Sequence, residues 1–202
     1  MEHTLRLLDG TEIAVRPIVP EDAASLEAGF ERLGPESRYT RFLAPVGRLS
    51  GSQLRYLTEV DHHDHEALVA YEPGNEAAGI GVARFVRLDD DPGAAEFAVT
   101  VADDWQGRGV GTALLTLLAD RAREEGIDRF RGLMLARNEP IQNLVALFGT
   151  PRVLAREPGT VEVEVDLPQT GAGEHLEKML RAAARGLAEL QLRAADGGDP
   201  PG

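Results

Sequence analysis

Hydrophobic and polar positions along this chain follow two periods, which predict a succession of strands and helices. Alternation over short β-branched runs indicates half-buried strands, and apolar residues three and four positions apart indicate amphipathic helices. Strands are predicted at residues 5–8, 11–16, 67–71, 78–87, 94–101, 130–136, 153–156 and 160–167. Helices are predicted at residues 23–33, 35–39, 51–57, 107–125 and 139–148. This order is typical of an α+β fold, a mixed central β-sheet flanked by helices.

Turn and cap signals separate these elements. Asp9-Gly10 predicts a turn between the first two strands, Ser50 is a good N-cap, and Gly126 is a good C′ residue for the helix before it. The run 89–93 has three acidic residues, a proline and a glycine, and predicts an acidic loop.

The C-terminal part has a different pattern. A glycine-rich linker at 171–173 precedes a predicted amphipathic helix at 174–193, and 196–202 is a polar tail that we expect to be disordered. We therefore divide the chain into a domain at 1–168, a linker and C-terminal helix at 169–195, and the tail at 196–202. The leucine stripe of that helix favours packing, a homodimer contact or a lid over a cleft.

Composition narrows the function classes. The net charge of −13 argues against a nucleic-acid partner, since phosphate contacts need clustered basic residues, and it is compatible with a cationic substrate. The absence of cysteine excludes disulfides, Cys-ligated zinc and a Cys nucleophile. With no apolar run near 18 residues and no signal-peptide pattern, we expect a cytoplasmic protein that does not cross a membrane.

The most informative segment is the glycine-rich run 106–112, between a predicted strand and a predicted helix. Gly107, Gly109 and Gly111 let a pyrophosphate approach the backbone, and the first N–H groups of a helix are free to bind it. A Walker motif is excluded because the single lysine is Lys178, and the spacing is not that of a dinucleotide-binding fingerprint. An ordinary glycine-rich connection remains the alternative.

The run matches Q/R-x-x-G-x-G/A, and with the element order it resembles the acyl-CoA loop of GNAT superfamily N-acetyltransferases. The resemblance extends over about residues 11–167. The phrases at 13–18, 35–42 and 60–70 are similar to bacterial Pat-type protein lysine acetyltransferases. The resemblance implies the GNAT fold, in which splayed strands 4 and 5 hold acyl-CoA, and it implies acetyl-CoA as co-substrate.

The resemblance also implies roles for individual residues. The Val99 N–H would bind the thioester oxygen and Val101 would bind the pantetheine arm. The loop residues would hold the pyrophosphate: Gln106, Gly107, Arg108, Gly109, Gly111 and Thr112. Asn138, after the next strand, would contact pantetheine, cap the helix at Glu139, or do both.

Glu96 is the candidate general base. It lies ten residues before Gln106, and related enzymes place a glutamate there. A carboxylate accepts a proton from an ammonium effectively when apolar surroundings raise its pKa, and Ala94, Ala95 and Phe97 would supply them. The alternative is a solvated carboxylate at a strand edge.

Two features need separate interpretation. Many GNAT enzymes carry a tyrosine, as general acid to the thiolate, where this chain has Val145, so the thiolate would leave unassisted or take a proton from water. The run 61–66 contains three histidines and three acids, but neighbouring residues rarely converge on one ion. We expect no metal there, and instead a loop near the acceptor cleft.

The block 35–42 would border the acceptor channel.

These observations predict an acetyl-CoA-dependent N-acetyltransferase acting on an amine, with a protein lysine as the favoured acceptor. The resemblance suggests a partner such as an acyl-CoA synthetase. A small-molecule amine acetyltransferase is the first alternative. A non-catalytic acyl-CoA-binding regulatory module is the second, and the missing tyrosine favours it slightly.

Overall fold

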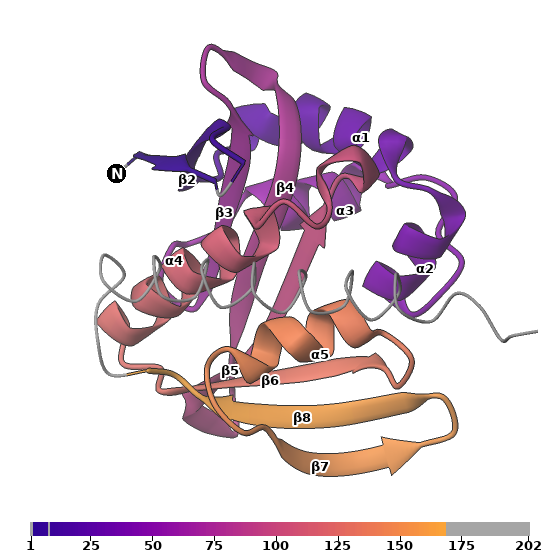
Figure 1. Cartoon of the computed structure of the whole chain (residues 1–202), viewed down its shortest axis with the longest axis vertical. Helices are drawn as coiled ribbons and strands as arrows, with labels where there is room; N and C mark the ends of the chain where they lie inside the picture. Colours follow the sequence, from indigo (N-terminus) through magenta and orange to yellow (C-terminus); the bar gives the residue numbers. More distant parts are fainter. Residues whose placement is uncertain (1, 8, 169–202) are drawn as a thin grey trace, which may run out of the picture.

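The computed structural model describes residues 2–7 and 9–168 (Figure 1). The linker, helix and tail predicted at 169–195 and 196–202 lie outside the described residues. The strands are β1 His3–Arg6, β2 Glu12–Pro17, β3 His65–Glu72, β4 Asn75–Leu88, β5 Asp91–Val101, β6 Arg129–Leu135, β7 Arg152–Glu157 and β8 Thr160–Asp166. The α-helices are α1 Ala23–Arg32, α2 Pro35–Phe42, α3 Gly51–Thr58, α4 Val110–Glu124 and α5 Glu139–Ala146. None of the helices in these ranges is long and apolar enough to cross a membrane.

The strands form one mixed sheet in the order β1-β2-β3-β4-β5-β6-β8-β7, which confirms the predicted α+β class. β5 and β6 run parallel, and the other neighbouring strands run antiparallel. A parallel pair needs a crossover connection, and α4 provides it.

β5 and β6 are paired over only part of their length. The two strands pair only at Ala94–Arg129, Ala95–Phe130 and Glu96–Arg131, although β5 continues to Val101 and β6 to Leu135. The strands therefore diverge after Glu96, and Figure 1 shows β6 leaving at a steep angle to β5. The resemblance implied that strands 4 and 5 of the GNAT fold splay apart, and in this chain those strands are β5 and β6. This prediction is confirmed.

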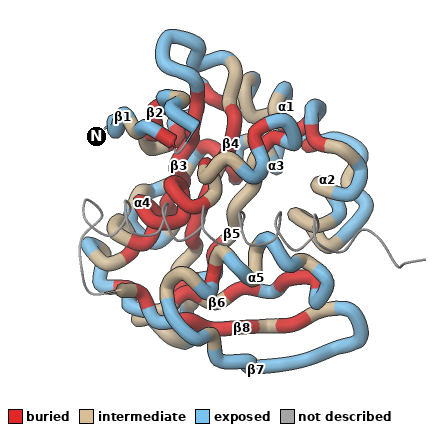
Figure 2. The backbone as a smooth tube through the Cα atoms, in the orientation of Figure 1, coloured by how far each residue is buried: buried red, intermediate tan, exposed pale blue. Residues whose placement is uncertain are grey.

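Helices cover both faces of the sheet. Valine, leucine and alanine side chains of α4 pack against β3, β4 and β5, and Figure 2 shows most of this helix buried. Gly81 of β4 allows that approach, because a Cβ there would lie 2.9 Å from Leu114 Cδ1. In a second apolar cluster α1 packs against α3. Its buried residues are Phe30, Leu33, Leu49 and Leu57.

Two predicted boundaries are wrong for identifiable reasons. The acidic loop expected at 89–93 is only a short turn, because β5 begins at Asp91, whose carboxylate accepts hydrogen bonds from Arg129 and Arg131. The helix expected from residue 107 begins at Val110, because Gly107 and Gly109 have φ values of +73° and +95°. These left-handed conformations cannot form part of a right-handed helix.

Candidate active site

The glycine-rich loop lies where the predicted anion site requires it, between β5 and α4. The first intrahelical bond runs from the Ala113 N–H to the Gly109 carbonyl, so the N–H groups of residues 110–112 precede the helical ladder. A Cβ at Gly107 would meet no atom within 4 Å, and the backbone there is open. The loop thus combines accessible N–H groups with the positive end of the α4 dipole, as an anion site does.

Thr112 and Gly111 lie in the first turn of α4 but face the protein interior. Thr112 is buried, and a Cβ at Gly111 would be 3.6 Å from both Val101 Cγ2 and Leu144 Cδ2. Gly111 therefore brings α4 into contact with β5 and α5. Any contact of these two residues with a phosphate would use backbone N–H groups.

The Arg108 side chain turns away from the loop. Its Nε donates to Asp9 Oδ2 at 2.9 Å, a terminal nitrogen donates to Thr11 Oγ1 at 2.7 Å, and the guanidinium stacks on Trp105 at 4.1 Å. These contacts hold the loop against the turn between β1 and β2. In this arrangement Arg108 offers a pyrophosphate its backbone, while its side chain supports the loop.

Gln106 braces the other side of the loop. Its Nε2 donates to the Val101 carbonyl at 3.2 Å and to Asp103 Oδ1 at 3.2 Å. Asp103 in turn accepts from Ser37 Oγ and from the Gly34 N–H. Gln106 therefore connects the loop to the end of β5 and to the start of α2.

The backbone of β5 presents polar groups toward the divergence. The Ala102 N–H donates to the Ile80 carbonyl, so in an alternating strand the even-numbered residues of this segment pair with β4. The N–H and C=O groups of Val99 and Val101 consequently point away from β4, toward the side that β6 has left. Since the Val101 carbonyl accepts from Gln106 Nε2, the groups that the resemblance would use for a pantetheine chain are the Val99 N–H and C=O and the Val101 N–H.

Glu96 lies at the last residue that pairs with β6, and its side chain is exposed. It lines a cavity of about 300 Å³ between β4, β5, α2 and α3. The apolar surroundings expected from neighbouring residues are only partly present, because Phe97 points to the other face of β5 and stacks on Phe130 at 5.4 Å. The residues that share the cavity with the carboxylate come mainly from other elements.

Sequence reasoning missed two of these cavity residues, Tyr56 of α3 and Arg84 of β4, and it covered Arg41 of α2 only as part of the block 35–42 expected to border the acceptor channel. Burial, followed by repulsion from Arg41, lowers the pKa of the Arg84 guanidinium to about 10. Burial also lowers the pKa of Arg41, against the attraction of the Glu96 carboxylate. An available signal was Arg84 itself, a charged residue inside the apolar run 82–86.

Asn138 precedes α5 and Val145 lies in its last turn. The Asn138 side chain accepts from the Ile141 N–H at 3.4 Å, so it caps α5 as one of the two expectations required. Val145 is 1% exposed and belongs to the core, so it supplies no proton donor. Tyr56, in contrast, lines the cavity that contains Glu96 and is 58% exposed.

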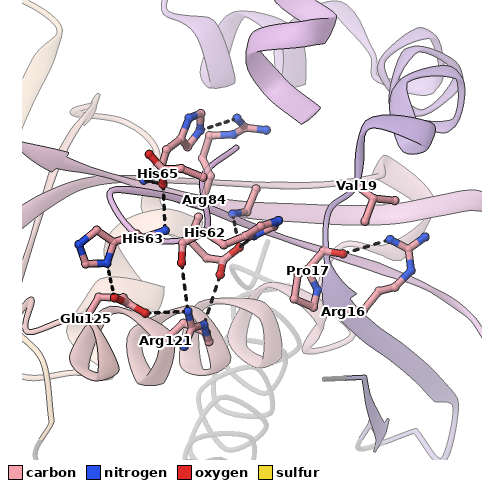
Figure 3. A network of polar contacts seen from close by, with 12 residues as sticks. Arg16, Pro17, Val19, His62, His63, His65, Arg84, Arg121 and Glu125 are labelled. Carbon is pink, nitrogen blue, oxygen red and sulfur yellow. Dashed lines mark hydrogen bonds and ion pairs between the residues drawn. The ribbon is translucent and has the colours of Figure 1, made fainter. Parts of the chain in front are cut away.

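The histidine run forms a network that links β3 to the end of α4 (Figure 3). Glu66, 1% exposed, accepts from Arg121 Nε at 3.2 Å and is 2.8 Å from His62 Nδ1. His63 contacts Glu125, and Asp61 accepts from the backbone N–H groups of residues 63–65. Only His65 reaches the cavity wall, through Arg84 at 3.2 Å. Among residues 2–7 and 9–168, no group of three or more potential ligands is arranged to hold a metal ion.

Comparison with known proteins gives this site its class. Residues 35–149 match the model of the acetyltransferase (GNAT) family. The chain is 37% identical over 155 residues to acetyltransferase Pat of Mycolicibacterium smegmatis, covering 76% of this chain but only 45% of that protein. It is 32% identical over 151 residues to an acetyltransferase of Pseudomonas aeruginosa, covering 73% of this chain and 80% of the relative.

A solved structure supports the same assignment. The GNAT domain of S. lividans PAT superposes with a TM-score of 0.76 at 36% identity, covering 82% of this chain and 97% of that domain. The chain belongs to the GNAT acetyltransferase family. The recognition of Pat-type relatives from the sequence is confirmed, although the chain spans less than half the length of the Mycolicibacterium protein.

Proposed function

We propose that this protein transfers an acetyl group from acetyl-CoA to the side-chain amine of a protein lysine, with Glu96 as general base. The divergence of β5 and β6 directly after Glu96 carries the proposal. Next to this divergence, β5 and its continuation carry the candidate base Glu96, the backbone groups of Val99 and Val101 that point away from β4, and the 106–112 loop. The resemblance of the phrases at 13–18, 35–42 and 60–70 to Pat-type protein lysine acetyltransferases supports the choice of a protein acceptor.

In the proposed reaction, the loop backbone binds the pyrophosphate and the Val99 N–H polarises the thioester carbonyl. The lysine nitrogen attacks the carbonyl carbon, the C–S bond breaks, and coenzyme A leaves as a thiolate. The proton lost by the amine passes to Glu96, directly or through a water molecule. An ordinary thiol pKa of about 8.5 makes the thiolate a fair leaving group, so Val145 in place of a tyrosine is compatible with turnover.

The cavity supports an amine acceptor. It opens on the face of β5 that carries the Glu96 carboxylate, while the apolar side chains of Val99 and Val101 pack toward the core cluster that contains α4. The acceptor and the acyl donor would therefore reach the reaction centre from different sides of β5. The protein's net charge of −13 also attracts a cationic amine at long range.

The test is acetyl transfer from acetyl-CoA to lysine-containing peptides and to small amines such as a polyamine, followed by mass spectrometry of the acceptor. Acetylation of peptide lysines with a higher kcat/KM than that of the small amines supports the proposal. Transfer to small amines alone would assign the first alternative. No transfer to any amine, with acetyl-CoA still bound, would contradict the proposal.

A further inference from the structure

The cavity beside Glu96 contains more positive charge than an amine site requires. Arg41, Arg84 and Glu96 all line it, so the ionised groups in its wall are two guanidiniums and one carboxylate. This is the reverse of the whole chain, which has 34 acidic and 21 basic residues. An ammonium substrate alone gains nothing from two neighbouring cations.

Arg84 is the better buried of the two arginines. It is 6% exposed, and it donates to the Leu57 carbonyl at 3.1 Å and to His65 Nε2 at 3.2 Å. Both partners are neutral acceptors, since burial and the nearby Arg84 charge lower the pKa of His65. Within the part of the chain that the structure describes, no carboxylate forms an ion pair with this guanidinium.

Arg41 has even fewer partners. It is half-buried, its guanidinium lies 5.0 Å from the centre of the Phe42 ring, and the Glu96 carboxylate attracts it, but among residues 2–7 and 9–168 it has no hydrogen bond or ion pair. Guanidiniums that are removed from water without a paired anion are costly to the folded protein, and they bind carboxylates through two parallel N–H donors. The cavity thus has unused capacity for an anion.

Phosphates of the co-substrate do not fill this capacity. The phosphate-binding loop follows the end of β5 at Val101, whereas the arginines lie beside Glu96 and Ala98. Arg84 is paired with Ala98 in the register of β4 and β5, and the three residue steps from Ala98 to Val101 span about 10 Å at roughly 3.3 Å per residue. The anion that the arginines accept therefore belongs to the acceptor end of the site.

We propose that Arg41 and Arg84 form a carboxylate subsite in the acceptor cavity, so that the preferred acceptor lysine lies beside an acidic side chain. The inference rests on the proposed function of the same site. Glu96 faces the lysine nitrogen and the two arginines face the neighbouring carboxylate. The long-range field of the chain opposes this preference, because a net charge of −13 repels an acidic peptide. A preference for an acidic peptide would therefore come from the local subsite, and a preference against it would come from the overall charge.

The test compares two blocked pentapeptides, Ala-Glu-Lys-Glu-Ala and Ala-Gln-Lys-Gln-Ala, by kcat/KM at saturating acetyl-CoA. We expect the wild-type protein to favour the acidic peptide by about tenfold, the effect of a charge-assisted hydrogen-bonded pair. Arg41→Gln should bring the ratio close to one, and Arg41→Lys should keep an intermediate ratio. Arg48→Gln is the matched control, since Arg48 is exposed and outside the cavity, and it should keep the wild-type ratio.

Equal rates with the two peptides, a preference for the neutral peptide, or a ratio unaffected by Arg41→Gln would overturn the subsite.

Failure of the proposed function has a different signature, namely no acetylation of either peptide. Calorimetry then decides the subsite independently, with the acidic peptide carrying acetyl-lysine titrated into the protein with coenzyme A. Binding that Arg41→Gln abolishes supports the subsite, and no binding overturns it. A free amino acid preferred to both peptides, with the same dependence on Arg41, would keep the carboxylate subsite and assign a small-molecule acceptor.

Discussion

Arg108 Nε lies 2.9 Å from Asp9 Oδ2, an ion pair that ties the glycine-rich loop 106–112 to the turn between β1 and β2. The partners are 99 residues apart in the chain. The ion pair and the stacking of Arg108 on Trp105 direct the loop's arginine side chain toward the first hairpin. The loop therefore has a fixed shape without a side chain projecting into the region where a pyrophosphate would bind.

Replacing Asp9 tests this tie. Asp9→Asn removes the charge that holds Arg108, and we expect the Kd for acetyl-CoA to rise about three- to tenfold, because loop ordering then has to accompany binding. Calorimetry measures the Kd directly. Glu12→Gln is the matched control, since Glu12 forms an exposed ion pair with Arg6 in the same hairpin and should leave the Kd unchanged. An unchanged Kd in Asp9→Asn would show that the loop keeps its shape without the tie.

The same pair predicts an acid-dependent loss of stability. Hydrogen bonds from the Thr11 backbone and hydroxyl, followed by Arg108, lower the pKa of Asp9 from 3.8 to about 2. Because the pKa of Asp9 is lower in the folded state, the contribution of Asp9 to the free energy of unfolding is complete above about pH 4. It is lost as the pH falls through about 2. Urea unfolding should show a stability difference between wild type and Asp9→Asn at pH 6 that shrinks toward about pH 2.

The left-handed glycines of the loop predict separate effects on stability and binding. Gly107 has φ of +73°, and a Cβ there would meet no atom within 4 Å, so Gly107→Ala costs about 1 kcal/mol from backbone strain alone. Gly107→Asn should recover part of that stability, since asparagine tolerates this conformation. Both substitutions place a side chain over the open backbone, and both should weaken acetyl-CoA binding. Wild-type affinity in both variants would contradict a binding role for this face of the loop.

Gly132 of β6 allows the Phe97 ring of β5 to pack closely against β6. A Cβ there would lie 2.7 Å from Phe97 Cε1, and the Phe97 ring is stacked on Phe130. Gly132→Ala should therefore destabilise the fold by about 1–3 kcal/mol, the usual cost of overpacking a core. Gly47→Ala is the control, because Gly47 has no atom within 4 Å of a Cβ and should change stability little. Thermal unfolding of the two variants gives the comparison, and equal midpoints would contradict the close packing.

His65 predicts a second dependence on pH. The pKa of His65 is lowered in the folded state, so neutral His65 contributes to the free energy of unfolding. That contribution is complete above the ordinary histidine pKa of 6.5 and is lost as the pH falls through the pKa of His65 in the folded protein. His65→Gln still presents an acceptor to Arg84 but does not titrate. Between pH 7 and pH 5, wild type should lose more stability to urea than His65→Gln does. Parallel losses would mean that His65 does not carry the effect, and His3→Gln, at an exposed position, controls for removal of a histidine.

Much of the sheet was predictable because its signals are local. The alternation in β8, the continuous apolar run in β3 and the glycines of the 106–112 loop each express a conformational preference of a few consecutive residues. The start of β5 was not predictable, because the pairing of Asp91 with Arg129 and Arg131 joins residues about forty positions apart. The pattern of a single strand also cannot show which elements cover it.

The candidate site divides in the same way. Glu96, Val99, Val101 and the loop could be placed on one strand and its continuation, and the structure brings them to the divergence of β5 and β6. Tyr56 and Arg84 could not be associated with Glu96, because α3 and β4 meet β5 only in the folded chain, and Arg41 was placed near the acceptor channel only through the resemblance of the block 35–42. The same limit applies to the surroundings of Glu96, where sequence neighbours alternate between the two faces of the strand.

The measurement that tests the central claim most directly is the single-turnover rate of acetyl transfer by Glu96→Gln, with acetyl-CoA binding measured on the same protein. The account predicts an unchanged Kd for acetyl-CoA and a rate lower by about 10²–10⁴, the usual contribution of a general base. The deficit should lessen at high pH, where more of the amine is already neutral. A rate within about threefold of wild type at neutral pH would contradict the assignment of Glu96 as the base.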